Sequence, residues 1–359
     1  MSDSGKVLKL IEDNEIEWVD LRFTDPKGKW HHLTMVASAI DEDMLNDGFM
    51  FDGSSIDGWK AINESDMILM PDLGATYIDP FSSTPMLILV CNVVEPGTGE
   101  LYTRDPRSTA TRAEAYLKQT GIADTVFVGP EAEFFMFDDV KFMNSYNESS
   151  FKIDDIELPT NTNRDYEGGN LGHRPRAKGG YFPVAPVDSA VDIRGEMVST
   201  MLEMGLPCDK HHHEVAAAQH ELGLTYGTLV ETADRMQVYK YVVHMVAHAY
   251  GKTATFMPKP IAQDNGSGMH AQPIGVVPHP LRRGREGQAR RVPLPRRDGQ
   301  PLLVLRRPPH GRSRRHSEPP PPGRGDGQEP LRPAPCRVGR GADCLRQLAR
   351  GAHQPHRRP

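Results

Sequence analysis

Two glutamates in the segment GPEAEFF have the spacing of paired metal ligands. Glu131 and Glu133 lie two residues apart in a stretch typical of a strand, so both carboxylates share one face. Carboxylates on one face of a buried strand repel each other unless a cation lies between them, and hard divalent cations prefer such oxygen ligands. The alternative is a solvated face with two ordinary surface glutamates. The apolar flanks, Val126–Val128 and Phe134–Phe137, favour the metal site.

A second cluster of ligand types lies at 211–221, in the segment HHHEVAAAQHE. Alternation along a strand places His212 and Glu214 on one face. In a strand, the seven-residue step from Glu214 to Glu221 requires a turn or bulge between them. In a helix the same step is two turns, so the strand and the helix are both possible. The spacing matches neither the HExxH nor the HxxEH zinc pattern. The alternative interpretation is a His-rich polar face.

Two short loops could also contribute to a site. The segment Asn265–His270 (NGSGMH) is glycine-rich and follows a predicted strand, so its backbone N–H groups could approach an anion while His270 offers an imidazole. The segment FDGSS at 51–55 contains Asp52, which is either an exposed catalytic carboxylate or an Asx-turn residue.

The elements that must position these residues follow from periodicity and from Gly and Pro punctuation. Apolar spacing predicts four helices, at 4–15, 107–120, 192–204 and 229–250. Alternating or continuous apolar runs predict five strands, at 17–23, 31–36, 86–94, 126–137 and 253–257. The chain is therefore predicted to be α+β, with its chemistry on strands and the loops between them.

The composition changes near Ala271. Residues 1–270 hold 22 Lys and Arg against 42 Asp and Glu, whereas residues 271–359 hold 20 Arg, no Lys and 6 Asp and Glu. The net charge of −6 thus combines about −20 and +14. An acidic globular part suits metal ions better than nucleic acid. The Arg- and Pro-rich tail lacks the apolar surface to offset the entropy of ordering, so we predict disorder from 275.

The remaining bulk features indicate a cytoplasmic protein. The four cysteines, Cys91, Cys208, Cys336 and Cys344, have no CxxC spacing, which is typical of isolated thiols in a reducing compartment. Neither a leader sequence nor a long uncharged apolar run is evident, so no membrane association is expected.

Read together, these motifs resemble type I bacterial glutamine synthetase. The motifs that carry the resemblance follow the family's order: FDGSS (51–55), GPEAEFF (129–135), KGGYFPVAPVDS (178–189), HHHEVAAAQHE (211–221) and KTATFMPKPIAQDNGSGMH (252–270). The resemblance covers residues 1 to about 270. It implies a small N-terminal β-grasp-like domain at 1–105 and a partial catalytic domain at 106–274, an open β-barrel flanked by helices. A disordered tail follows at 275–359.

The resemblance also implies an activity and a site. The family joins glutamate and ammonia at the expense of ATP, through γ-glutamyl phosphate, and uses two or more Mg²⁺ or Mn²⁺ ions. By resemblance, one ion is held by Glu133, Glu214 and Glu221, and the other by Glu131 and His270. The remaining implied roles are a proton acceptor from ammonium at Asp52, glutamate binding at Asn265 and Gly266, and ATP contacts at Asp209 and Tyr226. Family members are dodecamers, in which the Asp52 loop reaches a neighbour's site.

The resemblance ends just after His270. The family continues with a further His and with the arginines that bind glutamate and phosphate, but here the sequence reads MHAQPIGVVPHPLRRG. The bias toward Arg, Pro and Gly is typical of GC-rich DNA read out of frame, so we interpret the tail as a frameshift. We therefore expect little or no activity from this polypeptide. The alternative is a non-catalytic fragment that could poison intact assemblies.

A nucleic-acid-binding arm is a further interpretation of the tail. Basic tails bind phosphate backbones. This tail has no aromatic residue to stack on bases, no Lys and many prolines, and these features argue against such a role.

Overall fold

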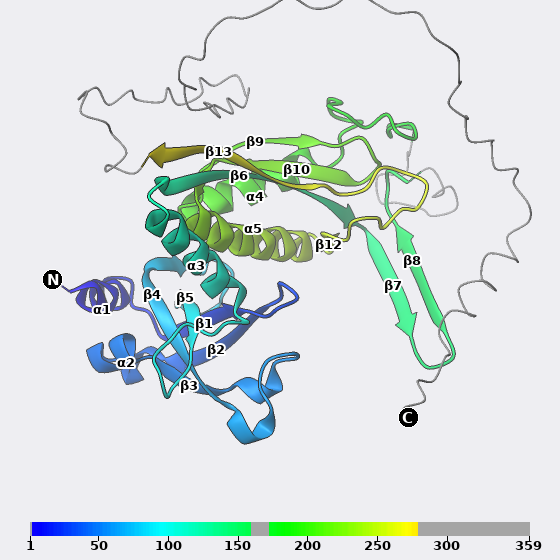
Figure 1. Cartoon of the computed structure of the whole chain (residues 1–359). Helices are drawn as coiled ribbons and strands as arrows, with labels where there is room; N and C mark the ends of the chain where they lie inside the picture. Colours follow the sequence, from blue (N-terminus) through cyan, green and yellow to red (C-terminus); the bar gives the residue numbers. More distant parts are fainter. Residues whose placement is uncertain (1, 159–171, 279–359) are drawn as a thin grey trace, which may run out of the picture. The chain divides into compact units, whose positions relative to one another are not determined.

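The computed structural model describes residues 2–158 and 172–278. Five strands between residues 18 and 94 form the first sheet (Figure 1). Its strand order is β2-β1-β5-β4-β3, in which β1 and β5 are parallel and the other neighbours are antiparallel. The strands are β1 (Trp18–Thr24), β2 (Trp30–Val36), β3 (Phe49–Asp52), β4 (Asp66–Ile78) and β5 (Met86–Val94).

The parallel strands β1 and β5 are buried on both faces. This explains the continuous apolar sequence of β5, whereas β1 buries Asp20 and Arg22 as an ion pair (2.6 Å). Leu87 and Leu89 of β5 pack in a core with residues of helix α1 (Asp3–Asp13) and helix α2 (Glu42–Asp47), whereas Ile88 faces a second core. Both helices begin at a side-chain cap, because Ser2 and Asp41 accept hydrogen bonds from the first-turn N–H groups.

The second sheet is built around one long strand, β6 (Ala123–Phe137). Four other strands pair with β6 in antiparallel fashion, and β9 joins through β10. These strands are β9 (Cys208–His213), β10 (Gln219–Leu224), β11 (Gly227–Thr228), β12 (Thr253–Thr255) and β13 (Met269–Pro278). Most of the predicted ligands therefore lie on strands that meet at β6.

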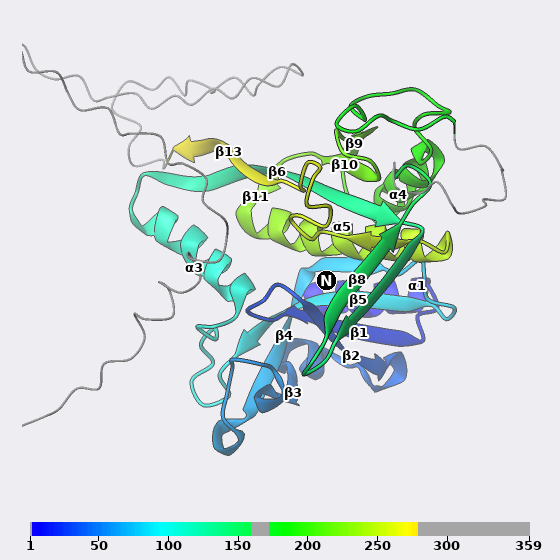
Figure 2. The same cartoon turned by 90° about the vertical axis from the view of Figure 1, so that its right-hand side faces the viewer.

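Helices cover one face of this sheet (Figures 1 and 2). They are α3 (Pro106–Gln119), α4 (Val191–Glu203) and α5 (Leu229–Ala249). The apolar stripe of α5 supplies Tyr239, Val242 and Val243 to a core that also contains Phe134 of β6 and Met197 of α4. A capping box between Thr228 and Glu231 fixes the start of α5 directly after β11.

A two-stranded hairpin follows β6, visible in Figure 2 as a long arm. It consists of β7 (Asp139–Asn144) and β8 (Ser149–Asp154). Phe142 and Phe151 are directly opposite each other in this pair and are 81% and 68% exposed. The hairpin was not predicted, although Val140 and Phe142 of β7 and Phe151 and Ile153 of β8 alternate with lysines.

Two buried arginines connect the first sheet to α5. Arg107, at the start of α3, donates to Asp234 of α5 (2.8 and 2.9 Å), to Asp72 of β4 (2.6 Å) and to Asn92 of β5 (2.6 Å). The Arg22 guanidinium lies over the rings of Trp30 and Tyr241.

Most predicted elements are present, with ends displaced by three residues or fewer. The predicted strand at 86–94 and helix at 229–250 correspond to β5 and α5. The strand β13 extends through Pro278, so residues 275–278 of the predicted tail pair with β6, consistent with the β-branched residues Ile274 and Val276. The rest of that tail, 279–359, lies outside the described residues.

Candidate metal centre and active site

Three adjacent strands place acidic and imidazole side chains in one row across the second sheet. Glu221 of β10 is directly opposite Glu133 of β6 on one side and His212 of β9 on the other. Residues directly opposite on neighbouring strands share a face of the sheet. The register therefore brings together ligands that are up to 88 residues apart in sequence, Glu133 and Glu221.

The closest group of ligand atoms belongs to His212, Glu214 and Glu221, and these atoms lie within 4.8 Å of one another. His212 Nδ1 is 3.4 Å from Glu214 Oε1, and His212 Nε2 is 3.7 Å from Glu221 Oε2. The chain turns between β9 and β10, with Ala218 at φ 61°, so the helical interpretation of this segment is wrong. This group has His212 in place of Glu133 of the predicted set Glu133, Glu214 and Glu221.

The electrostatics of this group favour a cation. Burial, followed by the charge of Glu214, raises the pKa of Glu221 to about 7. Burial also raises the pKa of Glu214, with Glu133 adding to the effect. The pKa of His212 is lowered, chiefly by burial, so its ring is neutral and has a lone pair to offer. Two crowded carboxylates and a neutral imidazole form a donor set that fits a divalent ion.

A second pair of ligands lies on β6 and β13. Glu131 and His270 are directly opposite in the register, and His270 Nδ1 is 3.3 Å from Glu131 Oε2. The side chains of Glu131 and His270 are about half exposed. Glu131 is thus closer to an ordinary surface glutamate than Glu133, which is partly buried. A Cβ atom on Gly268 would lie 2.8 Å from Glu133 Oε1 and 3.2 Å from His270 Nε2, which explains a glycine there.

The loop before β13 is fixed against the metal-ligand row. Gln219 Nε2 donates both to Glu133 Oε2 (2.7 Å) and to the Gly266 carbonyl (2.9 Å). A side chain on Gly266 would collide with the Pro258 carbonyl oxygen. Asn265 Oδ1 accepts a hydrogen bond from Lys178 Nζ (3.3 Å). Gln219 therefore connects Gly266 to Glu133, whereas the Asn265 side chain contacts Lys178.

Asp52 lies apart from this group. It is exposed at the end of β3 and accepts hydrogen bonds from the N–H (2.8 Å) and hydroxyl (2.6 Å) of Ser54. These bonds lower the pKa of Asp52. Among the described residues, the hydrogen bonds of its carboxylate stay within its own turn (Asp52–Ser55), so the Asx-turn interpretation is satisfied locally.

The two predicted ATP contacts flank the other end of β10. Asp209 is the extra residue of a β-bulge in β9, and its carboxylate lies where a side chain on Gly223 would be. Tyr226 packs edge-on against Phe127 of β6, with ring centroids 5.7 Å apart.

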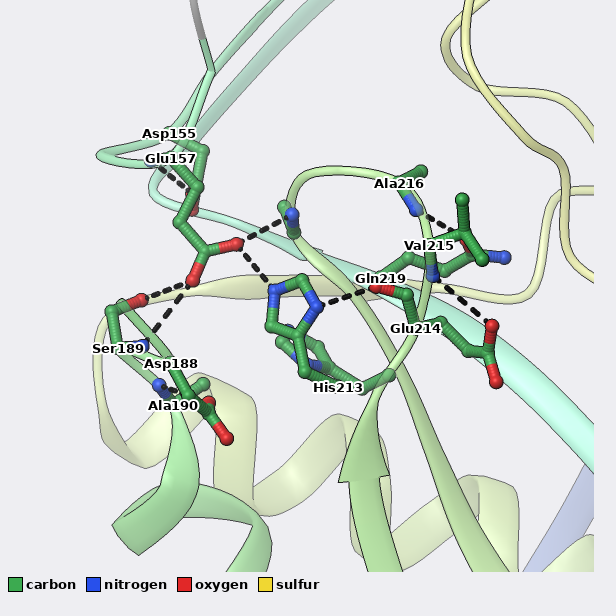
Figure 3. Close-up of polar contacts among 12 residues, drawn as sticks. Asp155, Glu157, Asp188, Ser189, Ala190, His213, Glu214, Val215, Ala216 and Gln219 are labelled. Carbon is green, nitrogen blue, oxygen red and sulfur yellow. Dashed lines mark hydrogen bonds and ion pairs between the residues drawn. The ribbon is translucent and has the colours of Figure 1, made fainter. Parts of the chain in front are cut away.

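Sequence reasoning missed the charged residues buried beside the ligands. Glu157 is 2% exposed and contacts His213, next to the Glu214 ligand (Figure 3). Asp188 and the buried Arg194 form another ion pair (2.5 Å), and Arg194 also donates to His220 Nδ1 (3.0 Å). The only available signal was that Glu157 lies between two apolar residues, Ile156 and Leu158.

Two family models match consecutive parts of the chain. The glutamine synthetase β-grasp domain matches residues 15–96, and the glutamine synthetase catalytic domain matches residues 103–273. Together they account for well over half of the sequence. The chain belongs to the glutamine synthetase family. Its first sheet is the β-grasp domain of a glutamine synthetase, and the second sheet with its helices belongs to the catalytic domain.

Individual relatives support the same conclusion. Over 270 residues, the chain is 63% identical to the glutamine synthetase of Rhizobium meliloti and 62% identical to that of Azospirillum brasilense. In both cases the match covers 75% of this chain and 58% of the relative. A glutamine synthetase structure from Plasmodium falciparum matches with a TM-score of 0.70 at 28% identity, covering 76% of this chain and 53% of that one. The chain thus spans less than two thirds of the relatives it matches.

None of the helices within residues 2–158 and 172–278 is long and apolar enough to cross a membrane.

Proposed function

We propose that the chain carries part of a glutamate–ammonia ligase subunit, an enzyme that forms glutamine from glutamate, ammonia and ATP through γ-glutamyl phosphate, and that this chain alone has little or no activity. The observation that supports this most is the row of carboxylate and imidazole ligands across β13, β6, β10 and β9, in a chain of the glutamine synthetase family. Phosphoryl transfer from ATP needs such a site, because the charge of the phosphates must be neutralised.

The ligands form two groups, each suited to one Mg²⁺ or Mn²⁺ ion. Glu133, Glu214 and Glu221 would hold the first ion, with His212 beside them. Glu131 and His270 would hold the second. When bound, these ions supply positive charge to the phosphate oxygens of ATP and of the acyl phosphate.

The remaining residues act on the substrates. Asn265 and Gly266 bind glutamate from the loop that Gln219 fixes beside Glu133. Asp209 and Tyr226 contact ATP. Asp52 takes a proton from ammonium to release the nucleophile, and the hydrogen bonds from Ser54 keep its carboxylate ionised for this role.

The separation of Asp52 from the metal ligands favours an oligomer. Within the described residues the Asp52 carboxylate accepts hydrogen bonds only from Ser54 and Ser55 and is exposed, so it is available to a neighbouring subunit, as in the dodecamer that the resemblance implies. We also propose domain boundaries near residues 105 and 274, and a cytoplasmic location. The boundary at 105 coincides with Asp105, the residue that caps α3.

A chimera tests this proposal. Residues 1–270 of this chain are joined to the remaining length of the Rhizobium meliloti relative, and phosphate release is measured. Release is expected only when ATP, glutamate, ammonium and Mg²⁺ are all present. Asp52→Asn and Glu133→Gln should each lower the rate by roughly 100-fold, since each removes a charge needed in the transition state. Glu12→Gln, an exposed change on α1, is the control and should have no effect.

The chain itself serves as the comparison. Because its match to the relatives ends after 270 residues, we expect it to release phosphate at least roughly 100-fold more slowly than the chimera. A folded chimera without phosphate release would contradict the proposed function. Equal rates for the chain and the chimera would contradict the expected loss of activity.

A further inference from the structure

A buried carboxylate lies behind the loop that carries Glu214. Glu157 follows β8 and is 56 residues from His213 in sequence, yet the two side chains form a fully buried pair, with Glu157 Oε2 2.7 Å from His213 Nε2. Neither residue belongs to the row of ligands described above. Their position raises the question of what a buried charged pair does there.

Glu157 and His213 together hold both ends of the loop between β9 and β10 (Figure 3). At its first residue, His213 Nδ1 donates to the carbonyl oxygen of Glu214 (2.6 Å). At its last residue, the N–H of Ala218 donates to Glu157 Oε2 (2.7 Å). The hydroxyl of Ser189 fixes the carboxylate from the other side by donating to Oε1 (2.6 Å).

The peptide group between Glu214 and Val215 connects His213 to the Glu214 carboxylate. The peptide between Glu214 and Val215 accepts from His213 through its carbonyl, and its N–H donates to Glu214 Oε2 (3.1 Å). Because a peptide unit is planar, its C=O and N–H rotate together. Releasing the carbonyl from His213 would let the plane turn, and the N–H that orients the Glu214 carboxylate would turn with it.

Stability alone does not account for such a pair. Replacing a buried ion pair with well-packed apolar residues is often neutral or stabilising, because desolvation offsets the attraction between the charges. Groups that hydrogen-bond to metal ligands, in contrast, commonly tune metal affinity by fixing ligand orientation. The hydrogen bonds from Ser189 through Glu157 and His213 lead to a candidate metal ligand, Glu214, and are of the kind that fixes a ligand's orientation.

We propose that Glu157 and His213 are positioning residues, which hold the Glu214 carboxylate in the orientation that binds a divalent ion. This inference rests on the proposed function, since it requires Glu214 to be a metal ligand.

Mn²⁺ binding to the full chain tests the inference without requiring turnover. The dissociation constant is measured by calorimetry, and the electron paramagnetic resonance spectrum of bound Mn²⁺ reports the symmetry of its ligands. Glu157→Gln is expected to weaken binding by roughly 10- to 100-fold and to change the spectrum. The matched control is Asp79→Asn, which removes another buried carboxylate, paired with Arg22 at 3.1 Å, and should leave both readouts unchanged.

Two further variants, Glu214→Gln and Ser189→Ala, distinguish a wrong metal site from a wrong positioning role. If Glu214→Gln leaves Mn²⁺ affinity unchanged, the proposed metal site is wrong. If Glu214→Gln weakens binding but folded Glu157→Gln does not, the positioning role is overturned and the metal site stands. If Glu157→Gln does not fold, Ser189→Ala tests the positioning role instead. This variant removes one hydrogen-bond donor to Glu157 without changing any charge. It should weaken Mn²⁺ binding by a smaller factor, and unchanged affinity would overturn the inference.

Discussion

Burial and the neighbouring negative charges act together on Glu221. Burial and the carboxylates of Glu214, Glu131 and Glu133 raise its pKa to about 7, against an ordinary value of 4.5. Below pH 4.5, Glu221 is protonated in both the folded and the unfolded chain, so it has no effect on stability. Between pH 4.5 and 7 the folded state keeps a proton that the unfolded state releases. The free energy of unfolding therefore falls across this window and stays lowered above it.

Replacing this charge should stabilise the metal-free protein. Glu221→Gln is expected to raise the free energy of unfolding by about 1–3 kcal/mol at pH 8, and by much less at pH 5. Denaturant unfolding in the presence of a chelator at the two pH values measures this difference. Glu203→Gln, an exposed change on α4, is the control. A Glu221→Gln variant that is less stable than the wild type at pH 8 would show that the site is not under charge repulsion.

Among the elements, α3 depends on Arg107 for its connection to the β-grasp sheet and to α5. This guanidinium is 7% exposed and binds Asp234 through two hydrogen bonds, with Asp72 and Asn92 beside it. Removing one partner of such a network leaves the other charge buried and unpaired. The first turn of α3 thus joins three elements that are distant in sequence.

We expect Arg107→Met to lower the free energy of unfolding by about 3–5 kcal/mol, because Asp234 would lose its counter-ion. The double variant Arg107→Met/Asp234→Asn should recover part of this loss, since the unpaired charge is then absent. Arg112→Met changes an exposed arginine on the same helix and should have an effect below about 0.5 kcal/mol. Urea unfolding measures all three, and equal losses for Arg107→Met and Arg112→Met would refute the interpretation.

The sequence predicts elements well where one period dominates. The apolar stripe of α5 and the continuous run of β5 each indicate one structure, and the motif resemblance identifies most of the ligand row. The segment at 214–221 is ambiguous from local residues, because seven residues fit either two helical turns or a strand–turn–strand. Glu157 could not be predicted, since its partner is 56 residues away and no local pattern records a long-range contact.

For the whole molecule, the β7–β8 hairpin presents apolar side chains to solvent. Phe142 and Phe151 form one cross-strand pair, while the neighbouring pair, Lys141 and Lys152, lies on the opposite face. Exposed aromatic side chains of this kind favour association between copies of a protein. The hairpin is therefore the feature that we expect to influence self-association most.

Replacing both aromatic residues should reduce self-association. Phe142→Ser/Phe151→Ser is expected to lower the mean molar mass in light scattering at a fixed protein concentration, because the exposed apolar surface is removed. Lys141→Ser/Lys152→Ser alters the other face of the same hairpin and is the control. If the two double variants have the same mass, the aromatic pair does not drive association.

The central place of β6 has a consequence for the time course of synthesis. The strand leaves the ribosome long before its partners, since Glu131 and His270 are 139 residues apart. At a translation rate of roughly 5–20 residues per second, β6 waits about 7–28 s for β13. During that interval its long apolar sequence has an unpaired edge. We therefore expect chaperones to bind the nascent chain, and slower translation lengthens the time for which the β6 edge is exposed.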